Sequence, residues 1–272
     1  SVVYDSEPLT KPVEIIGFPQ VHLKIAADAP LYQWTVRLED VWPDGQVSLV
    51  SGVLINPADR ISRLEQKPLV PGEPAELSGE IHYSTWRFKA GHRIRLAVSN
   101  AQFPMGWPTP YKGKTSLFTG AGTWIELPVV TKNTLTGVCD LPEPEEEEYP
   151  EDTTTYKNNA ENKEYPINYN PDTGESVYGS GEDEEWNIGD INYCRNELNT
   201  WKVNDKDPAH ASYKAVTDYD IYLPDRNIRL TSIFNFISDE KTFKLTVTRQ
   251  LFENEEIVRE KKWSKSIPRQ NQ

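Results

Sequence analysis

Apolar and polar residues alternate along much of the first half of the chain. In "VHLKIA", Val21, Leu23 and Ile25 occupy every second position, with polar His22 and Lys24 between them. Side chains two residues apart point to the same face of a β-strand. The pattern therefore predicts a strand with one buried face.

The same alternation recurs, with turn residues between the repeats. Trp34, Val36 and Leu38 precede "WPDG" at 42–45, where proline presets φ and glycine accepts positive φ. Ile94, Leu96 and Val98 follow a "KAG" turn, so His92 shares their inward parity and the arginines beside them point outward. Only "PADRISRLEQ" at 57–66 suggests a helix. Many short strands predict a β-sandwich or barrel over residues 1–135.

Strand alternation returns in the last quarter of the chain. Leu230, Phe234 and Phe236 alternate with polar residues, and Phe243 and Leu245 repeat the pattern. The polar runs "SDEK" and "ENEE" separate these segments as turns, which predicts a three-stranded antiparallel meander. Its apolar face needs a cover, so we expect residues 201–272 to pack on the sandwich.

Residues 136–200 lack apolar periodicity and carry most of the acidity. The whole chain of 272 residues has a formal net charge of −13, and glutamates, asparagines and prolines dominate this segment. It is predicted to be an acidic, Tyr/Asn-rich insertion or loop, parts of which pack through their tyrosines. Because no basic stripe offsets the acidity, nucleic acid is excluded as a partner.

The sequence shows no apolar run of about 18 residues that could cross a bilayer and no signal peptide, so we expect a cytoplasmic protein without a membrane partner. It opens on Ser1 rather than methionine, which suggests a piece of a longer protein. Cys139 and Cys194 lie in polar surroundings at no metal-binding spacing. A disulfide and two free thiols both fit, and free thiols are favoured.

Catalytic motifs are weak. A serine hydrolase of the α/β class needs GxSxG at a strand-to-helix turn, and the nearest approaches are "GESVY" at 174–178 and "GSG" at 179–181 in the acidic segment. His92 is the most suggestive histidine, and we expect it to cap the core by donating to a loop carbonyl, with no acidic partner nearby. The chain alone is therefore predicted to hold no catalytic residue and no cofactor.

Two candidate binding features remain. Asn168, Asn170 and Asp172 have the spacing that begins a calcium loop, but the later ligand positions do not match, so a solvated loop is favoured over a metal site. Five aromatic residues fit either a sugar-stacking platform or ordinary packing: Trp42, Trp86, Trp107, Trp124 and Tyr111.

The proline-rich loop "FPMGWPTPY" is the best candidate for an interface. Three prolines restrict its backbone while it presents large apolar side chains, which are typical anchors of domain interfaces. The candidate interface residues are Phe103, Met105, Trp107 and Tyr111.

Two long stretches carry a family resemblance. "KIAADAPLYQWTVRLEDVWPDGQVSLVSGVL" and "LSGEIHYSTWRFKAGHRIRLAVSNAQFP" contain the "DAP", "PDG" and "GHRIRL" elements in an order that resembles the C-terminal non-catalytic domain of CocE/NonD acyl esterases and X-Pro dipeptidyl-peptidases. The tail, from "DKDPAHASYKAV" onward, is also similar to bacterial CocE/NonD members. The glutamate-rich stretch departs from the family.

The resemblance implies an all-β, jelly-roll, galactose-binding-like sandwich with an added antiparallel meander. It implies an accessory domain that packs on the α/β-hydrolase domain of the same parent protein and shapes its substrate pocket, with the catalytic triad upstream of Ser1. It does not choose between ester and Xaa-Pro peptide substrates, and a homo-oligomer stays open. The alternatives are a free-standing carbohydrate-binding module and a structural adhesin-type domain.

Overall fold

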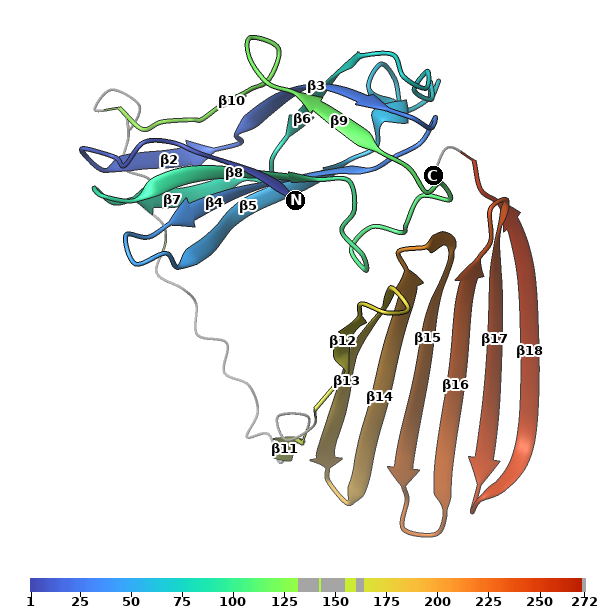
Figure 1. Cartoon of the computed structure of the whole chain (residues 1–272). Helices are drawn as coiled ribbons and strands as arrows, with labels where there is room; N and C mark the ends of the chain where they lie inside the picture. The colour runs from blue at the N-terminus through green and yellow to red at the C-terminus, as the bar shows by residue number, and fades with distance from the viewer. Residues whose placement is uncertain (132–141, 143–154, 160–163, 271–272) are drawn as a thin grey trace. The chain divides into compact units, whose positions relative to one another are not determined.

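A computed structural model describes residues 1–131, 142, 155–159 and 164–270. The chain forms two compact units, unit 1 within Ser1–Leu141 and unit 2 within Pro142–Gln270. Both are built from antiparallel strands (Figure 1). The described residues contain one short 3-10 helix and no α-helix.

Unit 1 holds strands β1 to β10. Their bounds are β1 Val2–Asp5, β2 Val13–Gly17, β3 Gln20–Ala27, β4 Trp34–Val41, β5 Val47–Ile55, β6 Ala75–Glu80, β7 Ser84–Phe88, β8 Arg93–Ser99, β9 Thr115–Phe118 and β10 Trp124–Glu126, with the 3-10 helix η1 at Pro57–Asp59. One sheet has the order β1-β8-β4-β5, and a second has β10-β3-β6 with β9 also paired to β3. β2 and β7 form a separate pair.

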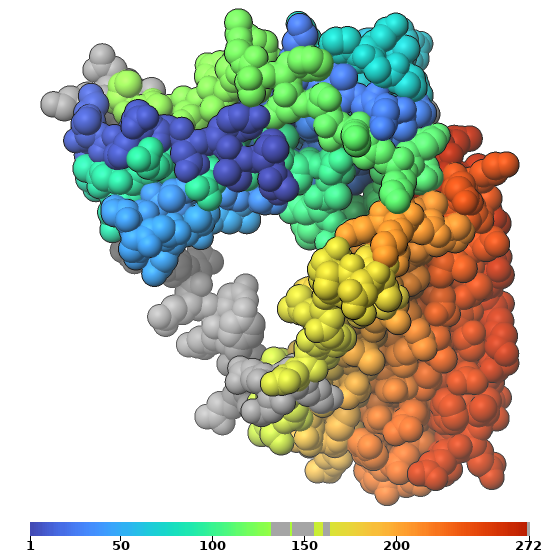
Figure 2. Space-filling view, viewed as in Figure 1, coloured from blue at the N-terminus to red at the C-terminus, as the bar shows by residue number. Residues whose placement is uncertain are grey.

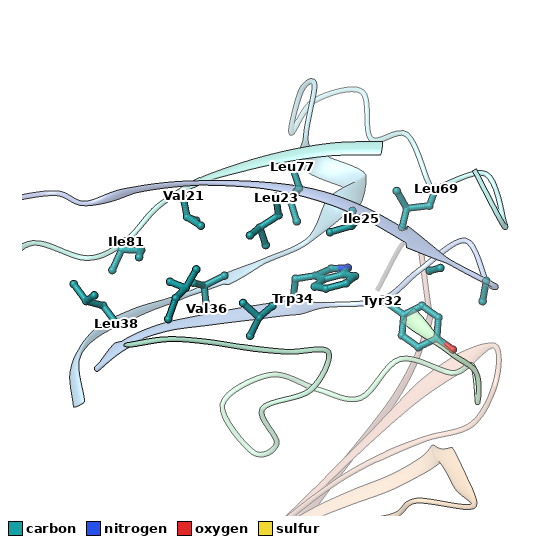
Figure 3. Close-up of a cluster of buried hydrophobic side chains, with 14 of the residues drawn as sticks. Val21, Leu23, Ile25, Tyr32, Trp34, Val36, Leu38, Leu69, Leu77 and Ile81 are labelled. Atoms are coloured by element: carbon teal, nitrogen blue, oxygen red, sulfur yellow. The ribbon is translucent and has the colours of Figure 1, made fainter. Parts of the chain in front are cut away.

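The core of unit 1 lies between these sheets. Val21, Leu23 and Ile25 of β3 face Val36 and Leu38 of β4, and all five are almost fully buried (Figure 3). Burying side chains of this size contributes roughly 1.5–3 kcal/mol each. The strands, turns and inward rows thus agree with the expected sandwich, while the jelly-roll connectivity stays a prediction. Where a helix was suggested at 57–66, only η1 forms.

Unit 2 is one long sheet. Its strands are β11 Thr155–Asn158, β12 Ile167–Asn170, β13 Glu175–Ile188, β14 Ile191–Asn204, β15 Asp207–Tyr222, β16 Asn227–Ser238, β17 Thr242–Glu253 and β18 Glu256–Pro268. The order is β11-β13-β14-β15-β16-β17-β18, with β12 also paired to β13. In the space-filling view, β14 to β18 form a continuous surface (Figure 2).

The predicted meander is confirmed as β16, β17 and β18, with turns at the two polar runs. The expectation of a loop is wrong for the end of the acidic segment, because β12, β13 and most of β14 lie before residue 201. Their strand pattern is hidden because Glu182 and Glu184 occupy positions on the same face as aromatic residues. The packing of residues 201–272 on the sandwich stays a prediction.

Candidate functional site

The proline-rich loop between β8 and β9 is fixed at both ends. Thr109 Oγ1 donates to the Leu31 carbonyl at 2.7 Å, and the Lys114 backbone N–H donates to Asp28 Oδ2 at 2.8 Å. Asn100 Nδ2 donates to Thr115 Oγ1 at 3.1 Å, across the base of the loop. These bonds hold the loop on unit 1 without covering its tip.

Close packing holds the middle of the loop. A Cβ placed on Gly106 would lie 2.3 Å from Gln33 Oε1 and 2.8 Å from Leu54 Cδ2, so only glycine fits there without displacement. The Phe103 and Trp107 rings meet edge to face, with centroids 5.8 Å apart.

The four predicted interface residues differ in exposure. Met105 is 78% exposed at the tip and Tyr111 is exposed, whereas Phe103 and Trp107 are half-buried. The four residues lie on one loop, as the sequence predicts. The structure shows that two of the side chains are exposed and two are partly packed. Their role as an interface stays a prediction.

Asp28 is the anchoring carboxylate at the base of this loop. Besides accepting from Lys114, it accepts from the Tyr32 hydroxyl at 3.3 Å through Oδ1. Burial, the charge of Asp28 and this hydrogen bond together raise the pKa of Tyr32 to about 12. Tyr32 therefore stays a hydrogen-bond donor at any physiological pH.

An apolar cleft of about 440 Å³ opens elsewhere in unit 1. Leu38, Ile94 and Leu96 line it from one sheet, and Trp124 and Ile125 line it from the other. A cleft of this size and lining suits a small apolar ligand or an apolar side chain from a partner.

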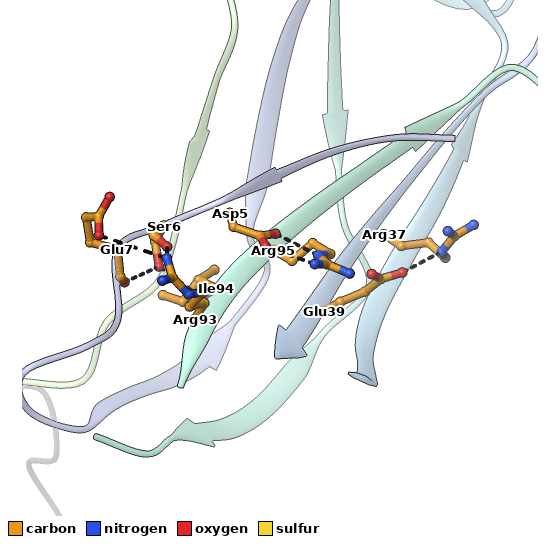
Figure 4. Close-up of polar contacts among 8 residues, drawn as sticks. All are labelled: Asp5, Ser6, Glu7, Arg37, Glu39, Arg93, Ile94 and Arg95. Atoms are coloured by element: carbon orange, nitrogen blue, oxygen red, sulfur yellow. Dashed lines mark hydrogen bonds and ion pairs between the residues drawn. The ribbon is translucent and has the colours of Figure 1, made fainter. Parts of the chain in front are cut away.

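Ion pairs surround β1 and β8 near this cleft (Figure 4). Asp5 Oδ1 and Oδ2 accept from Arg95 Nε at 2.6 Å and Nη2 at 2.8 Å, a bidentate pair. The Arg95 hydrogen bonds hold the pKa of Asp5 below its usual value against the opposing effect of burial. Arg93 Nη1 donates to the Ser6 carbonyl at 2.8 Å, so both arginines fasten β1 to the sheet.

His92 has an acidic partner, which corrects the sequence expectation. Its Nδ1 lies 2.9 Å from Asp40 Oδ1, and both side chains are buried. Asp40 Oδ2 also accepts from Trp86 Nε1 at 3.1 Å. His92 Nδ1 donates a hydrogen bond to this carboxylate, so the histidine caps the core through Asp40 and not through a loop carbonyl.

The sequence held a signal for this pair. Asp40 continues the inward parity of Trp34, Val36 and Leu38, just as His92 continues that of β8. β4 and β8 are neighbours in the sheet, so two inward polar residues at the same end of adjacent strands meet. The hydrogen bonds of His92 and Asp40 lead to Trp86 and not to a serine, threonine or cysteine nucleophile, which is the pattern of a structural tie.

The remaining candidates are structural elements of unit 2. Ser176 and Ser180 lie inside β13 and not at a strand-to-helix turn. Asn170 Oδ1 accepts from the backbone N–H groups of Asp172 and Thr173, which makes it a turn cap. In the described parts of the chain, no three His, Cys, Asp or Glu residues are grouped to hold a metal ion. Cys194 is a free thiol, whereas Cys139 lies outside the described residues.

The candidate aromatics are dispersed among different contacts. Trp42 packs beside His92, Trp107 meets Phe103, and Trp124 stacks on His22 at 3.9 Å between ring centroids. Trp42, Trp107 and Trp124 thus each pack on a different ring and not on one another. None of the helices in the described residues is long and apolar enough to cross a membrane.

Comparison with known proteins places this sandwich in a family. The model of the family described as the X-Pro dipeptidyl-peptidase C-terminal non-catalytic domain matches residues 1–137, half of the chain. The chain belongs to this family. Its sandwich is thus a C-terminal non-catalytic domain of the type found in CocE/NonD hydrolases.

Individual relatives of the X-Pro dipeptidyl-peptidase C-terminal domain are similar over short lengths. Cocaine esterase of Rhodococcus sp. (strain MB1 Bresler) is 30% identical over 101 residues, which covers 37% of this chain and 18% of the esterase. The chain thus spans about a fifth of the length of such curated relatives.

Solved structures similar to this domain include two hydrolases. An α-amino acid ester hydrolase is 25% identical with a TM-score of 0.44, and the match covers 47% of this chain and 25% of the hydrolase. A CocE/NonD family hydrolase from Staphylococcus aureus is 17% identical with a TM-score of 0.40, over 47% of this chain and 30% of the hydrolase.

Proposed function

We propose that this chain is the accessory part of a CocE/NonD-like serine hydrolase, of the acyl esterase or X-Pro dipeptidyl-peptidase type. In this role it packs on the α/β-hydrolase domain of the same parent protein and shapes the substrate pocket. The membership of residues 1–137 in a family of non-catalytic domains supports the proposal. The names of the relatives support an ester or peptide substrate class.

The anchored loop is the observation that carries the docking role. The Thr109 hydroxyl ties the loop to Leu31 and the Lys114 backbone N–H ties it to Asp28, while Met105 stays 78% exposed. A preorganised loop loses little conformational entropy when it docks, so an apolar tip binds at low cost. The Trp107 ring packs edge to face on Phe103 within the same loop.

The test uses the parent protein, expressed with its upstream hydrolase region. Met105→Ser and Trp107→Ala should each lower kcat/KM for a 4-nitrophenyl ester or an Xaa-Pro anilide, and should weaken docking by about 2 kcal/mol if Trp107 is an interface anchor. Leu64→Ala is the matched control, because Leu64 is 97% exposed on another loop of unit 1.

Melting curves of the 272-residue chain separate docking from folding. Met105→Ser should leave the melting temperature of the chain unchanged while it lowers that of the parent protein. Equal destabilisation of both proteins by Trp107→Ala would make Trp107 a packing residue of unit 1 and would contradict its role as an anchor.

The 272-residue chain alone should not turn over activated esters or Xaa-Pro anilides, because Ser176 and Ser180 lie inside a strand and not at the strand-to-helix turn that such a nucleophile needs. Turnover that disappears with Ser176→Ala or Ser180→Ala would overturn the proposal. A glycosidase region upstream, together with binding of oligosaccharides by the chain, would favour the carbohydrate-binding alternative.

A further inference from the structure

The two faces of the unit 2 sheet differ in composition. Residues paired across adjacent strands project to the same face, so the pairing register assigns each side chain to a face. We name the aromatic face after one row that crosses the sheet from β13 to β18, formed by Tyr178, Trp201, Tyr213, Phe236, Leu245 and Lys265. Within this row, Trp201 stacks on Tyr213 with ring centroids 4.7 Å apart.

The opposite face is largely polar. On this opposite face, Thr246 of β17 pairs with Ser264 of β18. Gln250 Nε2 donates to Glu260 Oε2 at 2.7 Å on the same two strands. Lys262 also pairs with Glu260 on this polar face, at 2.8 Å. A face of this kind is stable in water, so only the aromatic face needs a cover.

Large apolar side chains on the aromatic face are open within unit 2. Trp263 is 42% exposed, Tyr178 37% and Leu230 36%. The described residues of unit 2 form one sheet and no second layer. An apolar surface that extends over so many strands is typical of an interaction site.

Charges divide the aromatic face into an acidic and a basic side. A second row, next but one along the strands, runs Glu182, Glu197, Thr217, Ser232, Arg249 and Lys261. Its carboxylates lie on β13 and β14, its hydroxyls on β15 and β16, and its cations on β17 and β18. The row is therefore of opposite charge at its two ends.

The acidic side keeps its negative charge despite one arginine. Arg195 forms ion pairs with Glu182, with Glu184 at 3.5 Å and with Glu197 at 2.8 Å, so one cation meets three carboxylates. Burial favours the neutral form of Glu197, but hydrogen bonds from Asn199 and Arg195 outweigh it and lower its pKa. On the basic side, Arg249 is exposed and the Lys261 ammonium lies 4.9 Å from the Trp263 ring centroid.

We propose that a second copy of this chain covers the aromatic face, related by a twofold axis parallel to the strands that passes between β15 and β16. This operation places β13 of one copy over β18 of the other and keeps each row opposite itself. Glu182 then faces Lys261 of the second copy, and Glu197 faces Arg249. A twofold axis perpendicular to the strands would place like charges together, so the charge pattern selects one arrangement.

Side-chain sizes fit the same arrangement. The row between the two described above runs Ser180, Asn199, Ala215, Phe234, Val247 and Trp263. The twofold axis places Ser180 opposite Trp263 and Ala215 opposite Phe234, so a small residue meets a large one in two of the three pairs of this row. In the third pair, Asn199 meets Val247. Such alternation lets the inner faces of two aligned sheets interdigitate.

The face is large enough for a stable dimer. At about 4.8 Å between strands and about 3.4 Å per residue, β13 to β18 over about ten residues present about 1,000 Å². A standard protein interface buries about 800 Å² per partner. The sandwich of the same chain is the competing cover, and the experiment distinguishes the two.

The test measures the oligomeric state of the 272-residue chain by sedimentation velocity and light scattering. We expect a dimer that weakens at high salt. Lys261→Glu and Glu182→Lys should each raise the dimer dissociation constant about tenfold to a hundredfold, because like charges then meet twice. An equimolar mixture of the two variants should restore dimers, since each heterodimer regains two opposite-charge contacts.

Two variants on the polar face serve as matched controls. Lys262→Glu and Asp183→Lys change the same charges one residue away, on the same strands but on the opposite side of the sheet. They should leave the dissociation constant unchanged. Recovery in the mixture also shows that both single variants fold.

Three outcomes would overturn the proposal. One is a monomer at all concentrations, which would assign the cover to the sandwich or to another protein. The second is a dimer that responds equally to the polar-face controls. The third is a failure of the mixed variants to associate although each is folded by circular dichroism.

Discussion

The side chains of His92 and Asp40 add a link to Trp86 of β7 at the end of the paired strands β4 and β8. Asp40 on β4 accepts hydrogen bonds from Trp86 on β7 and from His92, which precedes β8. A buried carboxylate is costly to desolvate, and two donors within hydrogen-bonding distance offset that cost. This pair fixes the end of the sandwich where the "WPDG" and "KAG" turns lie.

Asp40→Ala should lower the free energy of unfolding by about 2–4 kcal/mol, because it leaves the N–H donors of buried His92 and half-buried Trp86 without their acceptor. Urea denaturation of the chain measures the change. Asp5→Ala is the contrast, since the Asp5–Arg95 pair lies nearer the surface and should cost at most about 1 kcal/mol. Equal effects of the two substitutions would show that the buried pair is not special.

Individual residues show which contacts could be predicted from the sequence alone. The parity of Asp40 and His92 was readable, but their meeting depends on the pairing of β4 with β8, which alternation does not specify. Met105 and Trp107 lie on one loop, as their closeness in the sequence requires, and their role as an interface stays a prediction. Their different exposure was not foreseeable, because it depends on the approach of Gln33 and Leu54 to Gly106 from distant parts of the chain.

The turn between β16 and β17 is held by one carboxylate. Asp239 Oδ1 accepts from the backbone N–H groups of Lys241 and Thr242 at 2.8 Å and 2.7 Å, and Oδ2 accepts from the Thr242 hydroxyl at 2.7 Å. These hydrogen bonds lower the pKa of Asp239 to about 2. The turn therefore favours the ionised carboxylate.

Asp239 should make the stability of unit 2 depend on pH in acid. Its folded pKa lies below the ordinary 3.8, so its contribution is complete above pH 4 and is lost as the pH falls toward 2. Melting curves of the chain between pH 2 and pH 6 should show this loss, and Asp239→Asn should reduce it. An unchanged pH profile in the variant would contradict this role.

Strand prediction in unit 2 depended on which side chains share a face. On β16 and β17, Phe234, Phe236 and Phe243 give a clear alternation, and the sequence located these strands. On β13 and β14, Glu182, Glu184 and Arg195 take positions on the aromatic face, where Arg195 forms ion pairs with both carboxylates. Their ion pairing replaces apolar burial, so a pattern based on hydrophobicity alone does not detect the strands.

At the scale of the whole molecule, the two units are stabilised by different means. The buried core cluster belongs to unit 1, where two sheets enclose it. Unit 2 depends on long antiparallel ladders and on cross-strand side-chain pairs. Sequence composition did not reveal this division, because both units have a similar supply of β-branched and aromatic residues.

Two truncations should have opposite results. A chain that ends at residue 141 should stay soluble and melt cooperatively, because the core cluster is complete within unit 1. A chain that ends at residue 200 should aggregate, because it exposes β14 as a new edge and divides the sheet. Calorimetry and light scattering check both, and a soluble 1–200 chain as stable as the full chain would contradict the second expectation.

The single sheet of unit 2 is, in effect, a linear array in which each strand interacts only with the strands on either side. Nearest-neighbour systems of this kind lose structure from their ends. β18, whose residues are all exposed, should therefore fray first and exchange its amide protons fastest, while β15 and β16 should exchange last. A partner bound to one face would contact several strands at once. It would therefore couple the unfolding of strands that the backbone hydrogen bonds join only two at a time.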